Sequence, residues 1–159
     1  MATYDELAGR LVVITGGANG IGHAMVEAFH AQGAVVCFCD LDDRAGMRLA
    51  KRLGNRAEFS KVNLCREASI KRWVARLTKR HGDIHVLINN AGALFNQHQL
   101  TREGLEQSYA LLLLSPVLLT ERLLPLLEAH ELPARVINVV SGGMYAERLN
   151  LKRLNLSAD

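Results

Sequence analysis

The chain has 159 residues, of which 49% are hydrophobic and 22% are charged, with a formal net charge of +3. This balance is typical of a globular domain and excludes wholesale disorder, and so small a net charge, without a block of basic residues, gives no indication of a nucleic-acid partner. The start of the chain lacks the apolar region of a secretory signal, and the longest apolar stretch, residues 110–120, is well short of the roughly 20 residues that span a bilayer, so we expect no membrane span.

Five apolar runs predict β-strands, and because most runs are continuous rather than alternating, both faces of each strand are expected to be covered. In chain order the runs are residues 11–14, 34–39, 59–64, 84–88 and 135–140. Amphipathic stretches between them predict helices over residues 20–31, 43–53, 67–80 and 102–129. Gly33, Gly54 and Gly82 follow the first three helices, at the position where a residue in the left-handed region ends a helix.

The alternation of strands and helices predicts an α/β fold with a parallel sheet, in one domain over residues 1–159. A complete dinucleotide-binding fold of the Rossmann type is doubly wound and has about six strands. Because five are visible here, we expect a Rossmann-type doubly wound parallel sheet that is incomplete at its C-terminal side. The fifth strand would then be an exposed apolar edge, which favours pairing or aggregation.

The fourth helical region carries eleven leucines between Leu105 and Leu127, and these cannot all face one side. A helix that is apolar all round is buried on more than one side. One face is expected to pack on the protein's own sheet. The other face either contacts a second subunit or contacts nothing, and the sequence favours neither. A homo-oligomer through the helix from Leu105 to Leu127 is therefore one expectation.

A glycine-rich loop, residues 15–22 with the sequence Thr-Gly-Gly-Ala-Asn-Gly-Ile-Gly, follows the first strand and opens the first helix. Gly16 permits the tight exit turn, Gly20 lets the backbone approach a pyrophosphate, and Gly22 allows close packing of helix and sheet. The helix N-terminus adds N–H groups and a dipole that favour an anion. We therefore expect Gly16, Gly20 and Gly22, with the intervening Asn19 and Ile21, to bind a dinucleotide.

The second strand ends at Asp40, close to the offset of roughly 20 residues at which an acid binds the adenosine ribose. Its carboxylate can accept hydrogen bonds from both ribose hydroxyls and would repel a 2′-phosphate, so NAD is predicted over NADP. Arg44 keeps NADP as the alternative, since a guanidinium can meet a phosphate. The other interpretation of Asp40 is a solvated loop acid beside Asp42 and Asp43.

The sequence resembles the short-chain dehydrogenase/reductase family from about Leu11 to Ser141. Three motifs carry the resemblance, in order and on the expected elements: the glycine loop, Asn89-Asn90-Ala91-Gly92 after the fourth strand, and the fifth strand ending in Ser141. The Ser-Gly-Gly-Met sequence that starts at Ser141 resembles the retinol-dehydrogenase-like branch. The resemblance implies an NAD(P)-dependent oxidoreductase that acts on an alcohol or carbonyl compound.

The resemblance also implies roles for single residues. Asn90, Ala91 and Gly92 match the segment that supports the central sheet and the nicotinamide side, and Ser141 matches the serine that hydrogen-bonds the substrate carbonyl. Asn63 stands where the family has an adenine-contacting Asp, and its amide can still donate and accept. Leu112 stands where the family has a catalytic Asn whose main-chain carbonyl holds a relay water. Because Pro116 lacks an N–H, that carbonyl would lack its helical partner and could still serve.

The largest departure concerns the family's general acid, a Tyr followed four residues later by a Lys that lowers the Tyr pKa. No such pair occurs: Tyr4 is followed at that spacing by Ala8, Tyr109 by Leu113 and Tyr145 by Leu149. Residues 144–159 resemble the longer insertion of the retinol-dehydrogenase-like branch. The pair is therefore expected beyond Asp159, with this chain a truncated product that is inactive alone.

The remaining residues give weaker indications. The histidines show no zinc-like spacing with a third ligand, so no metal is expected. Cys37, Cys39 and Cys65 are too few for a disulfide framework and suggest buried, reduced thiols in a cytoplasmic protein. Two hypotheses result: an oxidoreductase seen without its catalytic Tyr and Lys, or a non-catalytic nucleotide-binding or protein-interaction module derived from that family.

Overall fold

The computed structural model describes residues 3–146, 148 and 150. The strands are β1 (Leu11–Thr15), β2 (Val35–Asp40), β3 (Ala57–Lys61), β4 (Val86–Asn89) and β5 (Arg135–Asn138). The helices are α1 (Gly20–Ala31), α2 (Asp43–Leu53), α3 (Glu67–Arg80), α4 (Gln107–Tyr109) and α5 (Ser115–Leu127). Short 3₁₀ turns cover Asp5–Leu7 and Gly142–Tyr145, and a π-helical segment covers Ala110–Leu114.

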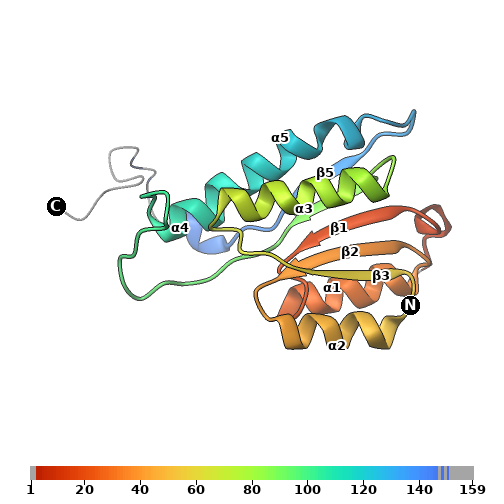
Figure 1. The fold of residues 1–159 in the computed structure, drawn as a ribbon, viewed down its shortest axis with the longest axis horizontal. Helices are drawn as coiled ribbons and strands as arrows, with labels where there is room; N and C mark the ends of the chain where they lie inside the picture. Colours follow the sequence, from red (N-terminus) through yellow and green to blue (C-terminus); the bar gives the residue numbers. More distant parts are fainter. Residues whose placement is uncertain (1–2, 147, 149, 151–159) are drawn as a thin grey trace.

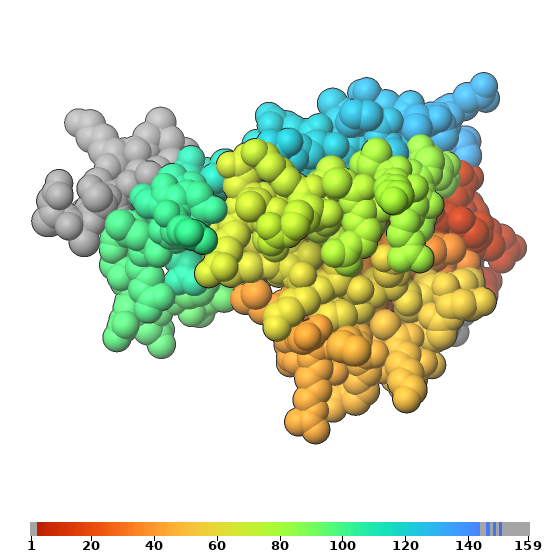
Figure 2. All heavy atoms as spheres, in the orientation of Figure 1, coloured from red at the N-terminus to blue at the C-terminus, as the bar shows by residue number. Residues whose placement is uncertain are grey.

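The five strands form one parallel sheet in the order β3-β2-β1-β4-β5. Helices α1 and α2 cover one face, and α3 and α5 cover the other (Figure 1). Seen as spheres, α3 and α5 lie side by side on the second face, where they contact each other (Figure 2). The α/β doubly wound fold is therefore confirmed, and its strand order reverses between β1 and β4, where such sheets open a ligand crevice.

The central strand β1 explains why its sequence is a continuous apolar run. Leu11 and Val13 belong to the core under α3 and α5, whereas Val12 and Ile14 belong to the core under α1 and α2. All four side chains are at most 5% exposed. Successive side chains point to opposite faces of a strand, so a strand covered on both sides needs apolar residues at every position.

Several predicted boundaries are wrong. The third strand spans Ala57–Lys61, earlier than predicted, because Val62 and Leu64 are buried although they lie outside the strand. The long helical region starts at Gln107 rather than at residue 102, because a turn and an isolated bridge from Leu100 to Glu106 come first. Gly33 and Gly54 have the expected positive φ of 85° and 84°. Gly82 does not, because the chain leaves α3 through its C-cap His81 in extended backbone.

The helical path through the leucines is not a regular α-helix. The N–H of Ser115 donates to the carbonyl of Ala110, five residues back, and the Ser115 hydroxyl donates to the carbonyl of Leu111 at 2.9 Å. Pro116, which has no N–H, follows directly and lies in the first turn of α5. A wide turn of this kind is the usual response of a helix to a missing donor.

The leucines divide between two faces, as expected. Leu119, Leu123 and Leu127 are buried against the sheet and α3, whereas Leu113, Val117 and Leu124 are 43–46% exposed. By length and composition alone, the helix Gln107–Leu127 could cross a membrane, a test that core helices of soluble proteins also pass. Of its most apolar window 33% is buried, and the absence of a membrane span stays a prediction.

Strand β5 lies at the edge of the sheet and, in the part of the chain that the structure describes, pairs with β4 alone. Its Val136 and Ile137 side chains are 39% and 41% exposed. The expectation of an exposed apolar edge strand is therefore confirmed for the described residues. The 3₁₀ turn after β5 includes the start of the predicted insertion; most of residues 144–159 lie outside the described part.

Candidate functional site

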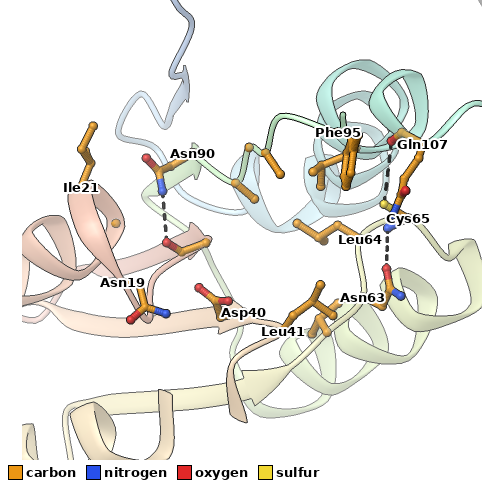
Figure 3. A pocket seen from close by; sticks show the side chains of 17 residues that line it. Asn19, Ile21, Asp40, Leu41, Asn63, Leu64, Cys65, Asn90, Phe95 and Gln107 are labelled. Carbon is orange, nitrogen blue, oxygen red and sulfur yellow. Dashed lines mark hydrogen bonds between the residues drawn. The ribbon is translucent and has the colours of Figure 1, made fainter. Parts of the chain in front are cut away.

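A cavity of about 500 Å³ opens at the carboxyl ends of the strands, at the point where the strand order reverses. Nine of the ten residues predicted to bind the cofactor line it, and Figure 3 shows this wall. They are Gly16, Asn19, Ile21, Gly22, Asp40, Asn63, Asn90, Ala91 and Gly92. Gly20 does not line the cavity, although it lies between Asn19 and Ile21, which do.

The glycines of the loop each meet a distinct steric demand. Gly16 has a φ of +68°, and a Cβ there would lie 2.8 Å from the Cα of Ala91. A Cβ on Gly22 would lie 1.9 Å from the Gly16 carbonyl oxygen, so only glycine permits this approach of α1 to the loop. Gly20 has a φ of +54° with nothing within 4 Å of an added Cβ, which leaves open space beside its backbone. The turn predicted at Gly16 and the close packing predicted at Gly22 are present.

The N-terminus of α1 lies at the cavity wall, which Asn19, Ile21 and Gly22 line. Asn19 is the N-cap but makes no side-chain cap, because its amide donates to Asp42 Oδ2 at 3.1 Å. The first turn of α1 contains no acid. An uncapped helix N-terminus flanked by glycines is a ready site for a phosphate anion.

Asp40 lies at the end of β2, with its carboxylate held between the loop and its own turn. Oδ2 accepts from the N–H of Ala18 at 3.0 Å, and Oδ1 accepts from the N–H of Asp42 at 3.1 Å. A carboxylate has about four acceptor positions, so both oxygens can still accept from a ligand. Asp40 is the one formally charged side chain among the described residues that line the cavity.

Asp42, one of the acids beside Asp40, has a structural role. Its Oδ1 caps α2 by accepting from the N–H of Ala45 at 2.9 Å, and its Oδ2 accepts from Asn19. These hydrogen bonds, the Ala45 bond foremost, lower the pKa of the Asp42 carboxyl. The acid that faces the cavity and the acid that caps the helix are therefore different residues.

Asn90 joins the end of β4 to the glycine loop. Its amide nitrogen donates to the carbonyl oxygens of Thr15 at 3.0 Å and Gly16 at 3.2 Å, and the second of these bonds is drawn in Figure 3. The Thr15 hydroxyl accepts from the N–H groups of Asn90 and Ala91, both at 3.0 Å. Thr15 is 2% exposed, so these bonds lie in the interior. The structure thus gives Asn90 a bracing role at the cavity.

The far end of the cavity is lined by Asn63 and by residues that the sequence does not single out. Asn63 Oδ1 accepts from the N–H of Cys65 at 2.9 Å, and this hydrogen bond fixes the Asn63 side chain at the wall. Gln107 Oε1 is buried and has no hydrogen-bond partner in the described structure. A ligand donor such as an amino group would satisfy that oxygen. The other unpredicted lining residues are Leu41, Val62, Leu64, Cys65, Ala93, Phe95 and Leu111.

A second cavity of about 1180 Å³ adjoins the first and is lined by Ser141. The two share one wall, formed by Ile21, Asn90, Ala91, Gly92 and Ala93. Ser141 is exposed, and its Oγ accepts from the N–H of Gly143 at 3.2 Å. Leu112 also lines this cavity, and its Cδ2 would lie 3.5 Å from a Cβ on Gly92. No Tyr, Lys or His is among the described residues that line it.

The residues present fit a dinucleotide in three ways. The loop offers N–H groups at one side, Asp40 offers acceptors in the middle, and Gln107 offers an unsatisfied acceptor at the far end. The sequence could show the first two, because glycine spacing and an acid after a strand are local patterns. It could not show Phe95, because the segment between β4 and α4, green in Figure 2, has no period. It could not show Gln107 either, because a predicted helix over residues 102–129 does not indicate which of its residues reaches the cavity.

A protein-family model described as short chain dehydrogenase matches residues 10–149. Dehydrogenase/reductase SDR family member 12 of Homo sapiens is 36% identical to the chain over 154 residues, and polyprenol dehydrogenase of Homo sapiens is 31% identical over 157 residues. Each alignment covers 94% of this chain and 48% of the relative, so the chain spans about half the length of these curated relatives.

Solved structures show the same similarity. A Pseudomonas aeruginosa RhlG/NADP active-site complex is 32% identical with a TM-score of 0.71, over 87% of this chain and 57% of that one. The crystal structure of 3-ketoacyl-(acyl-carrier-protein) reductase from Brucella melitensis complexed with NADH is 27% identical with a TM-score of 0.77, over 94% of this chain and 64% of that one.

Proposed function

The chain belongs to the short chain dehydrogenase family, and from this membership we propose that it supplies the cofactor-binding part of an oxidoreductase that interconverts an alcohol and a carbonyl compound. The observation that carries the proposal is the cavity at the strand ends, where an uncapped helix N-terminus and Asp40 face one space. A nicotinamide dinucleotide bound there would supply the hydride donor or acceptor. The partner of the complete protein is then a small-molecule substrate.

Within this proposal NAD is preferred over NADP. Asp40 supports the preference, because it is the one charged side chain among the described residues of the cavity wall and would repel a 2′-phosphate. Arg44, the residue that keeps NADP as the alternative, is exposed on α2 and does not line the cavity. The two similar structures hold one cofactor of each kind, NADP and NADH, so the preference rests on Asp40.

Ser141 is proposed to hydrogen-bond the substrate carbonyl from the second cavity. Its place across the shared wall supports this role, because a substrate there would lie against the cofactor side. The chain contains no Tyr followed four residues later by Lys. A missing general acid costs roughly 10²–10⁴-fold in rate, so we expect this chain to bind cofactor without turnover.

Calorimetric titration with NAD and with NADP tests the proposal. We expect NAD to bind with one site per chain and more tightly than NADP. Tighter NADP binding would refute the preference, and no binding of either would refute the cofactor site. Dehydrogenase activity of the purified 159-residue chain on any alcohol would refute the expected inactivity.

The second hypothesis is a non-catalytic nucleotide-binding or interaction module derived from the family. Two features favour it: the family resemblance puts Leu112 at the position of the catalytic Asn, and Leu113, Val117 and Leu124 form an exposed apolar face. The sequence of the complete protein distinguishes the two hypotheses, and the mass of the endogenous protein identifies that complete chain. A Tyr-x-x-x-Lys sequence in it supports the enzyme, and its absence supports the module.

A cytoplasmic location remains part of the proposal. The support is that Cys37, Cys39 and Cys65 are all free, with Cys37 and Cys39 buried. Unpaired thiols are the rule in a reducing compartment. Cell fractionation with an antibody to the chain tests the location, and recovery in a secretory or membrane fraction would contradict it.

A further inference from the structure

Three metal-ligating side chains meet at the end of the sheet opposite to the cavity. Cys37 comes from β2, Glu58 from the start of β3, and His81 directly follows α3 as its C-cap. Because α3 runs antiparallel to the strands, its C-terminus returns to the end at which the strands begin (Figure 1). The cluster is therefore separate from the proposed cofactor site.

The three donor atoms lie close to one another. Cys37 Sγ is 3.5 Å from His81 Nε2 and 4.0 Å from Glu58 Oε2, and the last two atoms are 3.8 Å apart. In a tetrahedral zinc site, bonds of about 2.0–2.3 Å place neighbouring donor atoms roughly 3.3–3.8 Å apart. The observed triangle thus needs a contraction of a few tenths of an ångström to surround a zinc ion.

The surroundings of the cluster suit a bound cation with one open coordination position. Cys37 is 1% exposed, whereas the side chains of His81 and Glu58 are 21% and 23% exposed, so solvent reaches one side. Glu58 Oε1 accepts from Arg80 at 2.8 Å, which leaves Oε2 turned toward the cluster. An ion pair of this kind fixes the orientation of a ligating carboxylate, as outer-shell partners do in metal sites.

We propose that Cys37, Glu58 and His81 bind a zinc ion, with a water molecule as the fourth ligand. Thiolate, imidazole and carboxylate are the ligand types that zinc takes, and a mixed set with sulfur disfavours magnesium and calcium. The ion would tie α3 to β2 and β3, and this stabilises the sheet from the end opposite to the cofactor.

Zinc binding at this cluster releases a proton from Cys37. A cysteine thiol without a metal carries its proton at neutral pH, and Cys37 is 1% exposed. The Zn²⁺ ion takes the sulfur lone pair as the S–H proton leaves to solvent, and the product is a zinc-bound thiolate and one proton. Imidazole binds through the neutral Nε2.

The test uses Co²⁺ and Zn²⁺ on the intact chain. Cobalt bound to a thiolate in a tetrahedral site gives an intense sulfur-to-cobalt absorption and visible bands, which we expect at one equivalent and which Zn²⁺ should abolish. Calorimetry in two buffers of different ionisation enthalpy should report proton release. Absence of the sulfur-to-cobalt absorption would overturn the proposal and leave a hydrogen-bonded trio without metal.

Variants assign the ligands. Cys37→Ser and His81→Gln should each weaken zinc binding by more than about 100-fold, since loss of an outer-shell partner alone costs 10–100-fold. Cys65→Ser and His98→Gln are the matched controls and should bind zinc as the parent chain does. Should Cys37→Ser fail to fold, His81→Gln decides, because His81 is partly exposed at the end of α3. Undiminished binding by His81→Gln would overturn the site.

Discussion

Asn90 donates twice to Thr15, with its backbone N–H to the hydroxyl oxygen and its side-chain amide to the carbonyl oxygen, both at 3.0 Å. The pair joins the ends of β4 and β1, the two strands between which the order of the sheet reverses. Because Gly16 follows Thr15 directly, this connection sets the position of the glycine loop against the opposite wall of the cavity. Asn90 thus has a structural task besides any contact with a cofactor.

The first prediction concerns Thr15→Val, which keeps the shape of the side chain and removes the hydroxyl. The partly buried N–H groups of Asn90 and Ala91 lose their acceptor, which is expected to cost about 1–3 kcal/mol of unfolding free energy. NAD affinity should fall as well, because the loop is less fixed. Urea unfolding and calorimetry measure both effects. Thr78→Val, on the exposed face of α3, is the control and should change neither.

The second prediction compares Gly20→Asp with Gly20→Asn, two side chains of one shape that differ in charge. Nothing lies within 4 Å of a Cβ at this position, and both residues tolerate a positive φ. A carboxylate beside a pyrophosphate repels it, so Gly20→Asp should weaken NAD binding by about tenfold or more relative to Gly20→Asn. Equal affinities of the two variants would place the pyrophosphate elsewhere.

The third prediction concerns cofactor preference. Asp40→Asn removes the charge that faces the cavity and keeps an acceptor oxygen for the ribose. The ratio of NADP to NAD dissociation constants should fall by about tenfold, which corresponds to about 1.4 kcal/mol. Asp43→Asn is the matched control, because Asp43 pairs with Lys61 at 3.8 Å and does not line the cavity. An unchanged preference for NAD in Asp40→Asn would mean that Asp40 does not select the cofactor and is a solvated loop acid.

The fourth prediction concerns acid sensitivity. Burial lowers the pKa of His85, whose Nδ1 accepts from the N–H of Leu11 at 3.3 Å and whose ring stacks on His130 at 4.4 Å. The unfolded chain therefore binds a proton more readily, so stability is complete above about pH 6.5 and is lost as pH falls toward the folded pKa. Burial lowers the pKa of His30 too, which adds a loss in the same window.

The measurement for His85 is the urea midpoint at pH 7.5 and 5.5. The parent chain should lose stability between these values, and His85→Gln should lose less. His98→Gln, an exposed position, serves as control and should follow the parent chain. A parent midpoint that does not change with pH would mean that the buried imidazoles accept protons without cost.

The fifth prediction is that the chain self-associates through α5. Val117 lies on the exposed apolar face between Leu113 and Leu124, so Val117→Glu should yield a monomer in light scattering. Ile137→Glu, on the exposed edge strand β5, tests the competing contact. If Ile137→Glu is a monomer and Val117→Glu is not, the interface lies at β5. A monomeric parent chain would contradict self-association through either element.

Much of the fold could be predicted because its signals are local. A strand followed by glycines at fixed spacing and then a helix is a pattern within a dozen residues, and β1, α1 and Asp40 all lie where that pattern requires. The third strand was misplaced because burial and strand pairing differ: Val62 and Leu64 are buried without belonging to β3. The retinol-dehydrogenase-like branch stays a prediction.

The parts of the site that could not be predicted depend on long-range packing. Phe95 reaches the cavity from a segment without periodicity, and Gln107 reaches it from the first position of α4. Cys37 and His81 are 44 residues apart on different elements, so no ligand spacing marks them. The wide helical turn before Pro116 could be recognised only from the hydrogen bonds that Ser115 makes in the structure.

The two cavities share their middle wall, whereas consecutive residues of the π-helical segment divide between them: Leu111 lines the first cavity and Leu112 the second. A substitution at Asn90 or Gly92 therefore alters both pockets together. A substitution at Leu112 or Val117 changes the larger pocket alone. Selection for a new substrate can act on the helix side without altering the nucleotide pocket, whereas the strand side is constrained by what the nucleotide requires.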